Sequence, residues 1–175
     1  SRATNYKKFG FSHFYTLEGD DIISHQDKID DSPYVSDEAA YTSTIEEVKK
    51  SKSGQFLQLI TMQNHMPYKN WYKNNEFKAE STTGTPLGEG ETESIETYAK
   101  GVEIDKPITV VFYGDHLPGI YSSASEDEDN SLDLHLTDYF IWSNKASSSA
   151  NTKISDDNYS SPNFFVAEAA EHMDA

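Results

Sequence analysis

The chain contains three apolar runs that predict buried strands. They lie at residues 55–62 (QFLQLITM), 108–113 (ITVVFY) and 136–144 (LTDYFIWSN). Runs that do not alternate strictly between apolar and polar residues are typical of strands covered on both faces, as in a parallel sheet flanked by helices. We therefore expect a central sheet that is mostly parallel.

Helical periodicity appears between and around these runs. Tyr41, Ile45 and Val48 share one helix face and Ser36 precedes them as an N-cap, which predicts a helix of about fifteen residues. Two more helices are predicted, over residues 5–11 with Gly10 as a left-handed cap, and over residues 164–173. The alternation of strand and helix predicts a three-layer α/β fold. Polar composition predicts loops at residues 17–33, 81–93, 122–131 and 145–158.

Two of the predicted strands end in side chains that suit ligand binding. His65 follows the first run, and Asp115 and His116 follow the second. In open α/β sheets the carboxyl ends of the strands line the ligand-binding crevice. A carboxylate oxygen beside an imidazole nitrogen is a suitable ligand pair for Mn²⁺ or Zn²⁺. The residues alone also fit a plainer interpretation, in which Gly114 and Asp115 form a turn and both histidines are solvated loop residues.

Composition narrows the classes of partner. The chain has 30 acidic and 14 basic residues, a net charge of −16, which argues against nucleic acid because phosphate binding needs basic surface. The same charge argues against tight binding to anionic lipid. Cysteine is absent, which excludes disulfides, thiolate metal sites and cysteine nucleophiles. No apolar run approaches the roughly 18 residues of a membrane span.

Three segments of the chain resemble one enzyme family. They are SRATNYKKFGF at residues 1–11, TMQNHMPY at 61–68 and FYGDHLPG at 112–119. They resemble the lipoteichoic acid synthase-like phosphoglycerol transferases of the sulfatase and alkaline phosphatase superfamily. The resemblance implies an alkaline-phosphatase/sulfatase-like three-layer sandwich with a mostly parallel sheet. Residues 1–175 would correspond to the carboxyl-terminal portion of its catalytic domain.

The resemblance also implies roles for four residues. Asp115 and His116 correspond to two metal ligands, with Mn²⁺ as the first expectation and Mg²⁺ or Zn²⁺ as alternatives. Arg2 corresponds to a residue that contacts the substrate phosphate, a task that suits a planar guanidinium. His65 corresponds to a residue that contacts the transferred headgroup. Without the resemblance, Arg2 would be interpreted as a frayed terminal residue.

Two features of the family are missing from the sequence. The family's Thr nucleophile and a Glu metal ligand lie in its amino-terminal half, and nothing in this chain matches them, so we expect both upstream. Because two ligands rarely make a tight site, we expect the chain alone to bind metal weakly and to be inactive. Relatives also carry a longer helix where Gly101 here meets Val102, which suggests that residues are omitted between these two.

The implied activity is transfer of phosphoglycerol from a glycerophospholipid headgroup to a glycerophosphate polymer of the cell envelope. The resemblance places such an enzyme at the cell membrane, anchored by a transmembrane region outside this chain, with its soluble domain facing the exterior. A sulfatase or phosphodiesterase of the same superfamily is the nearest alternative, and it would share Asp115 and His116. A non-catalytic accessory α/β domain is the alternative from another class.

Overall fold

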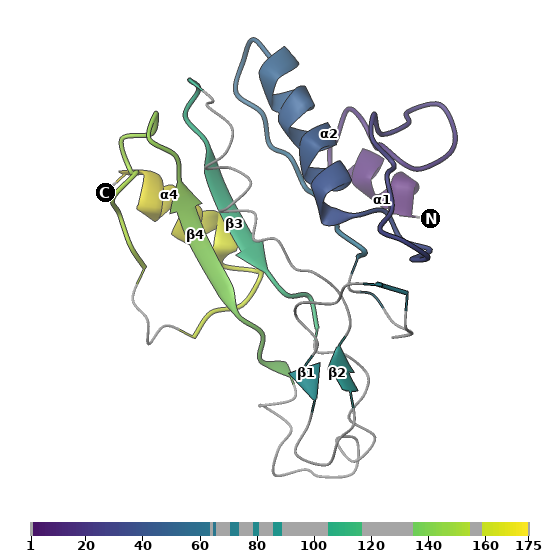
Figure 1. Cartoon of the computed structure of the whole chain (residues 1–175). Coiled ribbons are helices and arrows are strands. Elements are labelled where there is room, and N and C mark those ends of the chain that lie inside the picture. Colours follow the sequence, from purple (N-terminus) through teal and green to yellow (C-terminus); the bar gives the residue numbers. More distant parts are fainter. Residues whose placement is uncertain are drawn as a thin grey trace. The chain divides into compact units, whose positions relative to one another are not determined.

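The computed structural model describes residues 2–63, 65, 71–73, 79–80, 86–88, 105–116, 135–154 and 159–174. The chain divides into two compact units, Ser1–Glu93 and Ser94–Ala175. The first contains α1 (Arg2–Lys8), α2 (Asp37–Lys50), β1 (Ala79–Glu80) and β2 (Pro86–Gly88), and the second contains β3 (Thr109–Tyr113), β4 (Tyr139–Ser143) and α4 (Phe165–Asp174) (Figure 1). No helix in the described part of the chain is long and apolar enough to cross a membrane.

Helix α2 begins where the sequence predicts. The Ser36 hydroxyl accepts a hydrogen bond from the Ala39 N–H at 3.1 Å, which satisfies one of the free donors at the helix start. The helix ends at Lys50, and the N–H of the following C-cap residue, Ser51, donates to the Glu47 carbonyl. Of the predicted apolar face, Tyr41 is buried, and Ile45 and Val48 are partly buried.

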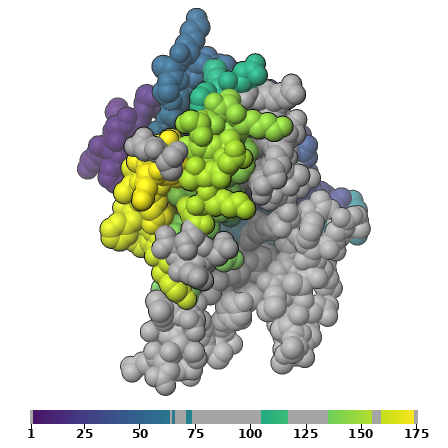
Figure 2. All heavy atoms as spheres, turned by 90° about the vertical axis from the view of Figure 1, so that its left-hand side faces the viewer, coloured from purple at the N-terminus to yellow at the C-terminus, as the bar shows by residue number. Residues whose placement is uncertain are grey.

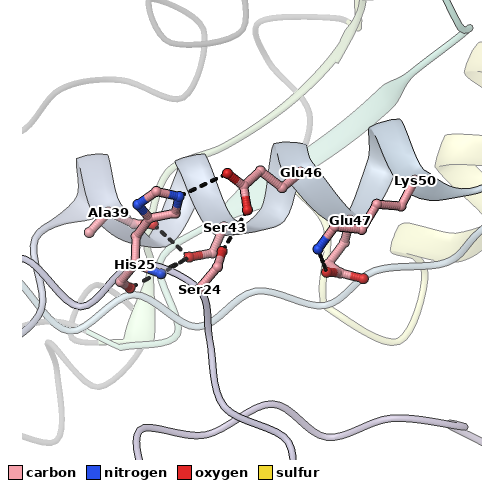
Figure 3. A network of polar contacts seen from close by, with 7 residues as sticks. All are labelled: Ser24, His25, Ala39, Ser43, Glu46, Glu47 and Lys50. Carbon is pink, nitrogen blue, oxygen red and sulfur yellow. Dashed lines mark hydrogen bonds and ion pairs between the residues drawn. The ribbon is translucent and has the colours of Figure 1, made fainter.

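Polar contacts bind the loop before α2 to the helix, as Figure 3 shows. The His25 N–H donates to the Ser43 hydroxyl at 3.0 Å, and the His25 Nε2 lies 2.9 Å from Glu46 Oε1. The Ser24 hydroxyl donates to the other Glu46 oxygen at 2.8 Å. These hydrogen bonds lower the pKa of Glu46. The bond from His25 has the largest effect and the bond from Ser24 the second largest. Part of the predicted loop at residues 17–33 is therefore fixed against α2.

Residues 55–62 are not the buried strand that the sequence predicts. The segment is extended and runs back along α2 (Figure 1), but no described residue pairs with it as a strand. Its apolar side chains are exposed, with 72% of Phe56 and 46% of Ile60 accessible. The physical reason is the lack of a second layer: among the described residues, Phe11 is the only aromatic residue whose ring packs on the Phe56 ring, with the centroids 5.7 Å apart. Burial depends on a neighbour, which the apolar run itself cannot supply.

The two strands of the second unit are confirmed, with a different pairing. β3 and β4 form an antiparallel pair, with Thr109 opposite Ser143 and Tyr113 opposite Tyr139. Both described sheets are antiparallel pairs, so the expected parallel arrangement is not found among the described residues. The side chains of β3 are only partly covered, contrary to the expectation of burial on both faces, because a single helix covers the pair in the described part of the unit.

Helix α4 packs across one face of this pair (Figure 1), and in Figure 2 its yellow residues lie beside the green residues of the β4 segment. The Phe165 ring contacts the rings of Tyr113 and Tyr139, each at 5.0 Å. At the other end of the helix, the buried His172 places Nε2 3.1 Å from the Ser143 hydroxyl. The helix predicted at residues 164–173 is confirmed, and its apolar and polar contacts fix it to the strands.

Helix α1 begins three residues before the predicted start at residue 5, and the chain leaves it through Gly10 in the predicted left-handed conformation, with φ of 91°.

Within the predicted loop at residues 81–93, Pro86–Gly88 forms the short strand β2. The predicted loop at 122–131 and the proposed omission between Gly101 and Val102 lie outside the described residues.

A buried carboxylate stands at the start of α2. Asp37 is 7% exposed, and its N–H donates to the Gln63 side-chain oxygen at 2.8 Å. Burial raises the pKa of Asp37 to about 6, although hydrogen bonds from the Thr61 side chain and the Gln63 backbone oppose the change. Its Oδ1 has no hydrogen-bond partner among the described residues.

We predict that the free energy of unfolding falls by roughly 2 kcal/mol between about pH 4 and pH 6 through Asp37. The folded state binds the proton more tightly than the unfolded state, whose pKa is near the ordinary 3.8, so stability present at low pH is lost as pH rises through this window. Asp37→Asn should remove this decrease and be more stable than the wild type at pH 7. Urea unfolding followed by Trp71 fluorescence in a Trp142→Phe background measures it.

The matched control is Glu38→Gln, which changes an exposed carboxylate in the same helical turn. This control should keep the wild-type decrease in stability. An Asp37→Asn variant with the same decrease as the wild type would show that another group is responsible.

Candidate functional site

The end of β3 is fixed by its partner strand. The Gly114 N–H donates to the Asp138 carbonyl at 3.2 Å, and the Thr137 hydroxyl donates to the Gly114 carbonyl at 2.6 Å. A Cβ atom at position 114 would lie 3.1 Å from the Thr137 Cβ, which is tighter than most real contacts. Glycine at this position therefore permits the close approach that orients the residues after the strand.

Asp115 and His116 follow at once and face solvent. The side chain of Asp115 is 80% exposed and that of His116 is 68% exposed, with Asp115 Oδ1 lying 3.8 Å from His116 Nε2. One carboxylate oxygen and one imidazole nitrogen suit Mn²⁺ or Zn²⁺, so the donor chemistry fits a divalent ion. In the described parts of the chain, no group of three or more His, Cys, Asp or Glu residues could hold a metal ion. A site with only these two exposed ligands should bind a metal ion weakly.

His65 lies in the first unit, after a turn in which its N–H donates to the Met62 carbonyl at 3.0 Å. Its Nδ1 lies 3.3 Å from the Tyr34 hydroxyl, and the two rings meet edge to face at 5.5 Å. The Tyr34 ring in turn meets the Trp71 ring at 5.7 Å. The imidazole is exposed, so it lies beside aromatic side chains without being enclosed.

Three segments support this histidine, and we call them the His65 platform: residues 30–37, residues 61–63 with His65, and residues 71–73. The Tyr72 hydroxyl donates to the Gln63 carbonyl at 3.0 Å. The Asp31 N–H donates to the Trp71 carbonyl at 3.2 Å, and the Lys73 N–H donates to Asp30 Oδ2 at 2.8 Å.

The centre of the platform is buried. Its buried residues are Ser32, Val35, Ser36, Asp37, Gln63 and Tyr72. Buried polar groups lose stability unless they are hydrogen-bonded, so the bonds between the segments restrain their relative positions. The platform is therefore suited to hold the His65 backbone in one place.

Arg2 is the first residue of α1 and is exposed. It lines an open hollow of about 460 Å³. The apolar and aromatic side chains that line the same hollow are those of Tyr6, Phe9, Phe11, Phe56 and Ile60. A guanidinium at an aromatic hollow suits an anion attached to an organic group.

Of the four predicted residues, the structure brings Asp115 and His116 together. Asp115 and His116 are neighbours in the second unit, whereas Arg2 and His65 belong to different elements of the first. Sequence reasoning missed Tyr34, Gln63 and Thr137. Gln63 directly follows an apolar run, so the sequence could have marked it as a polar residue at the end of a predicted strand. Nothing in the sequence indicates the contact between Tyr34 and His65.

We predict that Thr137→Val loosens the end of β3 and lowers the free energy of unfolding by about 1 kcal/mol, because the hydrogen bond to the Gly114 carbonyl is lost while the shape is kept. Hydrogen exchange at the Gly114 N–H should become faster. The control is Thr152→Val in the same unit, where the backbone N–H rather than the hydroxyl bonds to Ser149. Unchanged exchange at Gly114 in Thr137→Val would contradict the role given to the hydroxyl.

The chain matches the sulfatase family over residues 1–104 and again over residues 102–175, so the two matches together span its length. All four candidate residues fall within the matched stretches. Comparisons with curated proteins and with solved structures gave no match. The family has an α/β fold, in agreement with the helices and strands described above. The chain belongs to the sulfatase family.

Proposed function

We propose that the chain is part of a metal-dependent phosphoglycerol transferase. Its substrates would be the headgroup of a glycerophospholipid and the end of a glycerophosphate polymer, at the outer face of the cell membrane. Membership of the sulfatase family supports an enzyme of the sulfatase and alkaline phosphatase superfamily. The observation that carries the proposal is the exposed pair of Asp115 and His116 directly after β3. The narrower activity rests on the resemblance of the three segments that contain Arg2, His65 and this pair.

Each residue has a chemical task in this proposal. Asp115 and His116 bind Mn²⁺, with Mg²⁺ and Zn²⁺ as alternatives, and such an ion neutralises phosphate charge and lowers the pKa of an attacking hydroxyl. Arg2 binds the phosphate through two parallel N–H groups. His65 donates a hydrogen bond to the headgroup. No threonine of the chain matches the nucleophile of the transferases, so the proposal assigns the covalent step to no residue here.

A sulfatase or phosphodiesterase of the same superfamily is the second candidate, and membership of the sulfatase family supports it at the same level as the transferase. Sulfate and phosphate esters both present tetrahedral oxyanions, so the same metal pair and guanidinium would serve either. The two candidates differ in the organic group that the site must recognise. The transferase must recognise the hydroxyls of a glycerol group, which inorganic sulfate, the product of sulfate-ester hydrolysis, lacks.

We predict that the chain binds Mn²⁺ weakly and that both Asp115→Ala and His116→Ala abolish the binding measured by calorimetry. Each variant leaves one ligand, which is too few to displace water from the ion. Asp105→Ala is the matched control, because Asp105 is also an exposed carboxylate near β3, on the side where the strand begins. If the wild type and the three variants bind Mn²⁺ equally, or if the wild type does not bind it, then Gly114, Asp115 and His116 form only a turn. Such a result would favour a non-catalytic accessory domain. Turnover of a glycerophosphate ester by the chain alone would contradict the assignment of the nucleophile to another segment.

We also predict that sn-glycerol 1-phosphate binds the chain more tightly than inorganic sulfate, and that Arg2→Ala weakens this binding at least roughly 10-fold, as expected for a charge-assisted hydrogen bond. NMR titration measures both affinities. Lys8→Ala removes another exposed cation of the same helix and should have little effect. Tighter binding of sulfate would favour the hydrolase. Equal effects of the two substitutions would exclude a specific role for Arg2.

A further inference from the structure

One wall of the hollow beside Arg2 is a single face of α1. Four residues with the i, i+3, i+4, i+7 spacing of one helix face line it. They are Arg2, Asn5, Tyr6 and Phe9. The helical pattern extends to Phe9, whose N–H donates to the Asn5 carbonyl at 3.0 Å. This wall therefore has a guanidinium at its first position and an aromatic ring at its last.

The extended segment at residues 55–62 supplies the second wall. Phe56, Gln58 and Ile60 line the hollow, in agreement with an extended chain, in which alternate side chains point to the same side. The Phe56 and Ile60 side chains keep much of their surface accessible, and part of that surface faces the hollow. The second wall is thus mainly apolar, with one amide between its two apolar side chains.

Contacts between aromatic rings hold the two walls together. The Tyr6 ring stacks on the Phe14 ring at 5.2 Å and meets the Phe11 ring edge to face at 5.1 Å. The Phe11 ring contacts the Phe56 ring at 5.7 Å, which joins α1 to the extended segment. Side chains that are already restrained lose little further freedom when a ligand binds, so the aromatic surface is preorganised.

The hollow lies where the sequence has a local excess of positive charge. Residues 1–17 and 48–63 contain all its lining residues, together with six of the 14 basic residues of the chain and none of the 30 acidic ones. One of the six, Lys50, is paired with Glu47. The three cations of α1 form no ion pair with a described residue. In a chain with a net charge of −16, this local excess makes the hollow attractive to an anion.

We propose that this hollow binds an organic phosphate that carries an apolar chain. The Arg2 guanidinium holds the phosphate through charge-assisted hydrogen bonds, and the chain lies on the aromatic and apolar walls. Asn5 and Gln58 supply amide N–H donors, which suit ester oxygens. The volume of about 460 Å³ lies within the range of roughly 300–1,000 Å³ that is usual for small-molecule sites.

The proposed function gives this ligand an identity. It would be the glycerophospholipid donor, with the start of its hydrocarbon chains in the hollow. That identification rests on the proposed function, whereas the site for an alkyl phosphate does not. The hollow would also distinguish the donor from the acceptor, because a glycerophosphate polymer carries the same charge but no apolar group for the walls to cover.

The test compares ligands by NMR titration of the full chain. Ethyl and hexyl phosphate have the same charge, and we expect hexyl phosphate to bind at least roughly 10-fold more tightly, since each fully buried methylene contributes up to roughly 4-fold. Hexyl glucoside, which has the chain without the charge, should bind more weakly than hexyl phosphate. Equal affinity for the two phosphates would overturn the proposal. Hexyl glucoside binding as tightly as hexyl phosphate would also overturn it, because the occupant would then be uncharged.

Two substitutions separate the two ends of the ligand. Phe56→Ala should remove most of the advantage of hexyl over ethyl phosphate, whereas Arg2→Gln should weaken both ligands by roughly 10-fold. Phe56 is largely exposed, so its truncation should cost little stability. Phe164→Ala is the matched control, because Phe164 is also a largely exposed ring but belongs to the second unit. An advantage of hexyl phosphate that survives in Phe56→Ala would overturn the proposal. A dimer that Phe56→Ala dissociates in sedimentation would also overturn it, since a second copy would then cover the hollow.

A further ligand separates this proposal from the proposed function. Dihexanoyl phosphatidylglycerol, used as a monomer, should bind in the wild type and more weakly in Phe56→Ala. If hexyl phosphate binds through Phe56 but this lipid does not bind, then the proposed donor is wrong and the site for an alkyl phosphate stands. If sn-glycerol 1-phosphate binds through Arg2 but a hexyl chain adds no affinity, then the site fails and the proposed function stands.

Discussion

The buried side chain of Gln63 is the constraint on which the first unit depends. Its oxygen accepts the N–H of Asp37 at the start of α2, and its backbone carbonyl accepts the hydroxyl of Tyr72. One residue thereby joins a helix start, the segment that leads to His65 and a third segment that carries Trp71. Because these residues are buried, breaking either bond would cost stability, since water cannot readily replace the lost partner. The position of the histidine is thus coupled to the stability of the whole unit.

The same junction contains an unfavourable element. Carboxylates at the start of a helix are normally stabilised by the helix dipole, yet at Asp37 desolvation is the largest influence and it opposes the charged form. Two hydrogen bonds to the carboxylate only partly offset the loss of water. Such a group in a region that carries candidate binding residues is typical of sites where function limits stability.

Local features of the fold could be predicted from the sequence, and features that depend on distant neighbours could not. The cap at Ser36, the glycine turn at Gly10 and the limits of α4 follow from interactions within a few residues, and the structure agrees with them. The exposure of residues 55–62 and the antiparallel pairing of β3 depend on which segment lies alongside, which a hydrophobic pattern does not specify. In the candidate site, Asp115 and His116 are adjacent in the sequence itself. The contact of Tyr34 with His65 spans 31 positions and involves side chains with no distinctive motif.

The extended segment at residues 55–62 has a consequence for how the protein behaves in solution. It presents apolar side chains and is not paired as a strand with any described residue, which is the arrangement that recruits strands from other molecules. A net charge of −16 opposes such association, since two copies repel each other over about one Debye length, roughly 10 Å at 0.1 M salt. Salt that screens this repulsion would remove the main barrier to edge-to-edge aggregation. The colloidal stability of the chain therefore depends on ionic strength.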